Sequence, residues 1–217
     1  MYILSEPAMT KPEIREPRWP AFVAMVAAGF LYLAQPERLS VGPGWGLLVI
    51  VVVLLVPIIL SNLRGRHLVA RNFTYVANGV ITVSMVGSLA ILIHDLPRHL
   101  ESPSELLRSA TSLWVTNVLV FALWYWKLDA GGPVGRERAH GPLDSSFLFP
   151  QMVQEGCDPD WSPQFMDYLF LAFNTSTAFS PTDTAVLSRW AKIGMMLQSL
   201  ISLTIVALLA ARAVNIL

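Results

Sequence analysis

Long apolar runs that lack charged residues constrain this chain more than any other feature. The plainest run extends from Trp45 to Leu63 and carries Val, Ile and Leu on all faces of the expected helix. A helix needs about 20 mostly apolar residues to cross ~30 Å of hydrocarbon. Only 14% of the residues are charged, whereas soluble domains carry about 25%. The sequence therefore predicts an all-α, multi-pass membrane protein embedded in a lipid bilayer.

About five membrane-spanning helices and one shorter helix are predicted along the chain. The expected parts are a polar N-terminal tail at 1–18, four spans at 19–128, a long extramembrane loop at 129–162 and a C-terminal unit at 163–217. Two helix starts combine a serine with a following proline, and such a serine accepts a backbone N–H of the first turn. These expected N-caps are Ser102 and Ser162.

The C-terminal unit begins with a helix that is too short to cross a bilayer. Residues 164–178 are rich in aromatic side chains, and a polar turn separates them from an apolar run that continues to Leu217. Backbone that is not helical is tolerated at membrane depth only where protein buries it or water reaches it. This order predicts a re-entrant helix, which enters the membrane and returns to the same side before the last span.

Two threonines near the end of this short helix and an aspartate in the polar turn lie at a fixed spacing, Thr175, Thr177 and Asp183. Laid without gaps, they match the two threonines before the filter and the aspartate after it in tetrameric potassium channels, which the C-terminal unit resembles. The resemblance implies a homotetramer that passes monovalent cations. The candidate ion pathway consists of Thr175, Ser176, Thr177, Ala178, Phe179, Ser180 and Asp183.

The filter itself departs from the potassium-channel pattern. Ser180 and Thr182 stand where the channels have glycine, and Pro181 stands where they have tyrosine. Glycine adopts the backbone angles that turn carbonyl groups toward an ion, whereas proline fixes φ near −65°. We therefore expect conduction through side chains, with poor selectivity. A second interpretation stays open, in which Ser180 and Asp183 cap the last helix.

Five short motifs in the second half of the chain form another recognisable set. They are Trp124-Tyr-Trp126, Leu128-Asp-x-Gly-Gly-Pro133, Phe147-Leu-Phe-Pro-Gln151, Ala178-Phe-Ser-Pro-Thr-Asp183 and Ala211-Arg-Ala-Val-Asn215. Through them, residues 104–217 resemble a family of uncharacterised bacterial inner-membrane proteins. The resemblance implies a location in the bacterial inner membrane and brings no known activity.

Basic residues and the channel resemblance disagree about orientation. The basic stretch Arg64–Arg71 is expected in the cytoplasm by the positive-inside rule, which puts the N-terminus inside. Five spans then place the C-terminus outside and residues 129–162 inside, whereas a potassium-channel topology requires the opposite for the last unit. Either one span is miscounted or the pore-like loop enters from the cytoplasm. We favour five spans with the N-terminus inside.

Other function classes find little support in the sequence. The chain has 15 Lys and Arg against 15 Asp and Glu, so no basic excess predicts a nucleic-acid partner. The four histidines and the single Cys157 lack metal-ligand spacing, and we expect no cofactor and no enzymatic activity. Two hypotheses remain, a channel-like protein and a non-conducting, channel-shaped scaffold or partner subunit recognised through residues 129–162.

Overall fold

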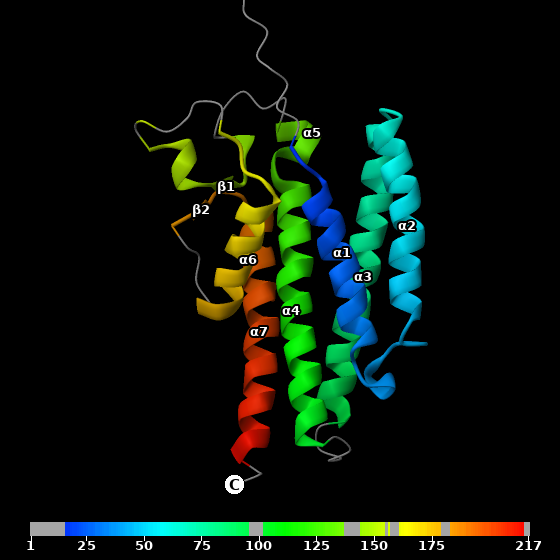
Figure 1. Cartoon of the computed structure of the whole chain (residues 1–217). Helices are drawn as coiled ribbons and strands as arrows, with labels where there is room; N and C mark the ends of the chain where they lie inside the picture. The colour runs from blue at the N-terminus through cyan, green and yellow to red at the C-terminus, as the bar shows by residue number, and fades with distance from the viewer. Residues whose placement is uncertain are drawn as a thin grey trace, which may run out of the picture.

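The chain forms a bundle of helices that lie roughly side by side (Figure 1). The computed structural model describes residues 16–95, 102–136, 144–154, 156, 161–178 and 183–214. The helices are α1 (Trp19–Leu33), α2 (Gly46–Leu63), α3 (His67–Asp95), α4 (Pro103–Leu128), α5 (Pro133–Arg136), α6 (Phe165–Ala178) and α7 (Arg189–Val214). Short 3-10 turns occupy Glu37–Leu39, Asp129–Gly131 and Pro150–Met152. Two short strands, β1 (Phe147–Leu148) and β2 (Ala185–Val186), pair in antiparallel fashion.

Within the described chain, four helices are long and apolar enough to cross a membrane, namely α2, α3, α4 and α7. Helix α1 is also apolar but has 15 residues, or about 22 Å at 1.5 Å per residue, which is less than the ~30 Å hydrocarbon layer. The prediction of an all-α, multi-pass membrane bundle is confirmed. The described residues contain four helices of spanning length and a shorter apolar helix at the position of the expected first span.

Basic side chains gather at one end of the bundle. Helices α1, α3 and α7 begin at this end, and α2 and α4 finish there (Figure 1). We call it the basic end, and its residues include Arg18, Arg64, Arg66, Arg71, Lys127, Arg136 and Arg189. The opposite end carries the α1–α2 connection and the C-terminal end of α7 (Figure 1).

Helix α4 lies at the centre of the bundle. It packs against α1, α3, α6 and α7, and 67% of its spanning stretch is buried, compared with 22% for α7. Several of its buried residues are small, among them Ser109, Ala110, Ser112 and Ala122. Small residues let helix backbones approach closely in a membrane, so the other helices can pack around α4.

Of the two predicted N-caps, Ser102 is confirmed and Ser162 is not. At α4, the Ser102 hydroxyl accepts a backbone N–H three residues later, and the glutamate there accepts the Ser102 N–H in return. At α6, the helix begins at Phe165, so Ser162 lies too early to occupy the N-cap position. Instead the Asp167 carboxylate accepts the Gln164 N–H at 2.7 Å, and this carboxylate satisfies the backbone donor just before the helix.

The segment that contains β1 folds back onto the basic end. Phe147 is fully buried, and its ring lies 5.1 Å from Tyr125, 6.1 Å from Tyr168 and 5.8 Å from Trp190, measured between ring centroids. These rings belong to α4, α6 and α7 respectively. Phe147 therefore joins three helices that are far apart in sequence.

Replacing Phe147 by alanine is expected to destabilise the protein by about 3–5 kcal/mol, because it empties a buried aromatic site. Val153→Ala, in the same segment, is the control, since Val153 is 59% exposed and its loss should change stability by less than about 0.5 kcal/mol. Thermal unfolding in mild detergent measures both. Equal effects of the two substitutions would contradict the assigned packing.

Candidate functional site

Helix α6 begins at the basic end, beside α4 and α7, and extends only part of the way along the bundle (Figure 1). Its 14 residues cover about 21 Å at 1.5 Å per residue. The Ser199 hydroxyl of α7 donates to the Thr175 carbonyl at 3.3 Å, so the last turn of α6 lies about 15 Å along α7 from Arg189. Strand β2 lies back at the basic end, where it pairs with β1 (Figure 1).

Gln198 of α7 connects three helices at this depth. Its side chain is fully buried, and its amide nitrogen donates to the Ala172 carbonyl at 2.7 Å and to the Ser176 hydroxyl at 2.8 Å. Its amide oxygen accepts the Tyr125 hydroxyl of α4 at 2.7 Å. Buried polar groups lose much stability without partners, so these bonds fix the position of α6 against α4 and α7.

Asn117 extends the same set of polar contacts along α4. Its amide nitrogen donates to the Gln198 carbonyl at 3.1 Å and to the Ser202 hydroxyl at 2.8 Å. We call Asn117, Tyr125, Ser176, Gln198 and Ser202 the Gln198 seam. Its side chains are uncharged and buried, which is typical of polar residues that hold membrane helices together.

A second polar cluster lies at the basic end, around the buried carboxylate of Asp129. This carboxylate accepts the Tyr168 hydroxyl at 2.5 Å, the Ser145 hydroxyl at 2.7 Å and the Ser146 backbone N–H at 2.5 Å. The three donors come from α6 and from the segment before β1. Asp129 therefore attaches both to the end of α4.

Arg136 completes this cluster from α5. Its guanidinium donates to the Trp126 carbonyl at 2.8 Å and to the Asp129 carbonyl at 3.2 Å, and it forms a 2.7 Å ion pair with Glu16. Burial raises the pKa of Glu16 above its ordinary value, and the Arg136 charge opposes that rise. Through these bonds Arg136 connects α5 to the end of α4 and to Glu16.

The residues of the predicted ion pathway are divided between buried and exposed positions. Thr175 and Ser176 are buried; the Thr175 hydroxyl donates to the Leu171 carbonyl, and Ser176 accepts from Gln198. Thr177 and Ala178 are exposed at the end of α6. Asp183, two residues before β2, is also exposed. Phe179 and Ser180 lie outside the described residues.

The last helix begins later than the alternative capping interpretation requires. Helix α7 starts at Arg189, six residues after Asp183. The Ser188 hydroxyl accepts the Ala191 backbone N–H at 3.4 Å. Ser188 therefore occupies the position before the first helical residue, and Asp183 lies too far from this helix start to cap it.

Sequence reasoning did not identify Gln198 or Asp129 as organising residues. A glutamine within a long apolar run is itself a signal, because polar side chains in membrane helices usually have partners. Its partners could not be inferred, since Tyr125 and Ser176 lie 73 and 22 residues away in sequence. Asp129 lies in a Gly-rich stretch that resembles an ordinary loop.

The described residues contain no group of three or more His, Cys, Asp or Glu side chains that could hold a metal ion. No family model, no curated protein and no solved structure matches the chain.

Gln198→Leu is expected to destabilise the bundle by about 2 kcal/mol, because it leaves the Ser176 and Tyr125 hydroxyls without their buried partner. Thr204→Val is the matched control on α7, because the Thr204 hydroxyl only donates to Leu200 of its own helix. Thermal unfolding in detergent compares the two variants. A loss in Gln198→Leu no larger than in the control would show that the seam does not stabilise the bundle.

Proposed function

We propose that this chain is a bacterial inner-membrane protein that assembles as a homotetramer and conducts monovalent cations with little selectivity. In this proposal α6 is a re-entrant pore helix, α7 is the inner helix, and the cation pathway passes the ends of the four α6 helices. Helices α1 to α4 surround this central unit in each subunit. The chain acts in passive ion movement and not as an enzyme.

The end of α6 carries the proposal. The last four carbonyl groups of a helix lack partners within that helix, and this end also bears the negative side of the helix dipole. In α6 one of the four, the Thr175 carbonyl, accepts the Ser199 hydroxyl of α7. Thr177 and Ala178 are exposed there, about 15 Å along α7 from Arg189. Lipid cannot satisfy such groups. Water and cations can, if further copies of the chain enclose the space.

The outer faces of α6 and α7 suit contact between copies. α6 exposes Met166, Phe170 and Phe173, and α7 exposes a longer row of apolar side chains that includes Met196 and Leu200. Only 22% of the spanning stretch of α7 is buried within its own chain. A closed ring of four subunits would cover part of this surface and enclose one central pathway.

The proposed pathway uses a subset of the residues expected from sequence. Thr177 contributes a hydroxyl at the end of α6, and Asp183 contributes a carboxylate nearer the basic end. Both side chains are exposed, whereas Thr175 and Ser176 serve the packing of α6. Negative charge and helix carbonyls favour cations over anions. A side-chain pathway of this kind predicts weak discrimination between K⁺ and Na⁺.

The basic end supports an orientation for this unit. Lys and Arg concentrate on the cytoplasmic side of membrane proteins, so we assign the basic end to the cytoplasm. The re-entrant unit then enters from the cytoplasmic side, and α7 runs from the cytoplasm to the exterior. This orientation is opposite to that of the corresponding unit of a potassium channel.

Asp183→Asn is expected to lower cation flux several-fold in liposomes that contain the purified protein, because it removes one carboxylate per subunit from the pathway. Glu37→Gln is the matched control, since Glu37 is an exposed acid in the connection at the opposite end (Figure 1). K⁺, Na⁺ and Cl⁻ fluxes are measured separately. The expected order has K⁺ and Na⁺ similar and Cl⁻ much slower.

Two results would contradict the proposal. One is a monomer in mild detergent, because a single α6 cannot enclose a pathway; a tetramer should have about four times the 24.0 kDa mass of the chain. The other is an intact tetramer without cation flux. That second result would favour the non-conducting scaffold, with residues 129–162 as the surface that a partner recognises.

A further inference from the structure

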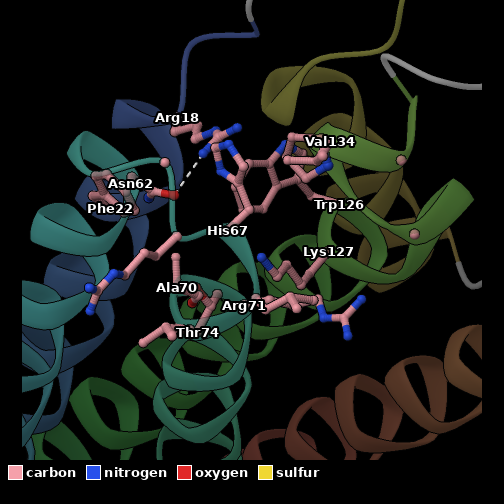
Figure 2. Close-up of a pocket in the computed structure, with 17 residues that line it drawn as sticks. Arg18, Phe22, Asn62, His67, Ala70, Arg71, Thr74, Trp126, Lys127 and Val134 are labelled. Atoms are coloured by element: carbon pink, nitrogen blue, oxygen red, sulfur yellow. Dashed lines mark hydrogen bonds between the residues drawn. The ribbon is translucent and has the colours of Figure 1, made fainter.

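A pocket of about 710 Å³ opens at the basic end, away from α6 and α7. Its lining comes from the start of α1, the α2–α3 connection and the α4–α5 region, and Figure 2 shows Arg18 and Asn62 on one side with Lys127 and Arg71 on another. This volume lies within the range of about 300–1,000 Å³ that is usual for small-molecule sites. None of the described residues of its lining belongs to α6 or α7, so the pocket is separate from the proposed ion pathway.

Positive charge dominates this pocket. Arg18, Arg66, Arg71 and Lys127 line it, and none of the described lining residues is Asp or Glu. Arg18 donates to the side-chain oxygen of Asn62 at 2.7 Å. Asn62 is neutral, so this bond does not cancel the charge of Arg18. Arg71 and Lys127 lie next to each other in the lining (Figure 2). Like charges held together in this way attract a compensating anion.

Lys127 is held in place by aromatic rings. Its side chain is half-buried, and its ammonium nitrogen lies 5.8 Å from the centroid of the Tyr75 ring and 5.9 Å from that of Trp126. The Glu16 carboxylate is bonded to Arg136 and to the Trp126 indole. The Lys127 ammonium group is thus positioned at the pocket by aromatic rings, while the Glu16 carboxylate is bonded to other residues.

The rest of the lining suits a ligand with a charged group and an apolar part. The first residues of α3, from His67 to Val69, belong to the lining, and the N-terminal end of a helix adds partial positive charge. Phe22 and Val134 contribute apolar surface. Basic pockets between membrane helices are known to bind phosphate-containing head groups.

We propose that this pocket binds the phosphate group of an anionic ligand, with Arg71 and Lys127 as its principal contacts. Arginine offers paired N–H donors that match phosphate oxygens, and lysine supplies a compact charge. Two sources present this chemistry at a membrane surface, the head group of an anionic phospholipid and a soluble phosphate compound. The proposal does not depend on ion conduction.

The test uses the full chain, purified and stripped of lipid, and follows its thermal unfolding during titration. The probes are phosphatidylglycerol, phosphatidylcholine and inorganic phosphate. Phosphatidylglycerol should stabilise the protein more than phosphatidylcholine if the ligand is a lipid, and inorganic phosphate alone should stabilise it if the ligand is soluble. In the double variant Arg71→Gln/Lys127→Gln, the probe concentration that gives half of the maximal stabilisation should rise at least about tenfold, because both charged contacts to the phosphate are lost.

Arg64→Gln is the matched control, because Arg64 is exposed at the same end of the bundle and does not line the pocket. It should bind as the unmodified protein does. Arg71→Lys/Lys127→Arg keeps both charges and should retain most of the binding. If the double Gln variant does not fold, the single variant Arg71→Gln replaces it in the titration. The Arg71 side chain is exposed, so its replacement should leave the fold intact.

Three results would overturn the proposal. The first is equal stabilisation by phosphatidylglycerol and phosphatidylcholine with no effect of inorganic phosphate. The second is a loss of binding in Arg64→Gln as large as in the double Gln variant, which would indicate a diffuse effect of charge. The third is unchanged binding in Arg71→Gln.

Discussion

The hydrocarbon of a bilayer offers no hydrogen-bond partners, and the structure of this chain follows from that constraint. Helices α2, α3, α4 and α7 satisfy their backbone groups internally over a length that can cross the membrane. Helix α6 is too short to do so, and its last turn lies beside the middle of α7. Hydrogen bonds from Gln198 and Ser199 hold that turn in place. The position of α6 thus depends on polar contacts inside the bundle.

The two buried polar clusters differ in charge because they differ in depth. The Gln198 seam contains amides and hydroxyls only, and such neutral groups lose less solvation than ions do when they are buried. Asp129, Arg136 and Glu16 lie at the basic end, where α4 finishes. There the carboxylate of Asp129 has three donors, and Arg136 has carbonyl and carboxylate partners. Charge is tolerated at this end because bonded partners compensate for burial.

Helix α4 separates the two regions for which function is proposed. Consecutive residues near its end serve different sides of the bundle: the Tyr125 hydroxyl bonds to Gln198 of α7, whereas Trp126 lines the basic pocket. Neighbouring residues in a helix point about 100° apart, so one turn of α4 contributes to both regions. An anion bound in the pocket would contact the same turn of α4 that holds the Gln198 seam.

Composition and apolar run length determined the membrane class, the order of the helices and the presence of a short helix before the last span. The start of α4 at Ser102 was also readable, because a capping box involves residues only three apart. Which polar groups meet was decided by tertiary structure. Thr175 and Ser176 face inward while Thr177 faces outward, since the packing of α6 against α4 and α7 selects its buried side. Gln198 and its partners, and likewise the basic residues of the pocket, lie far apart in sequence, and only helix packing brings them together.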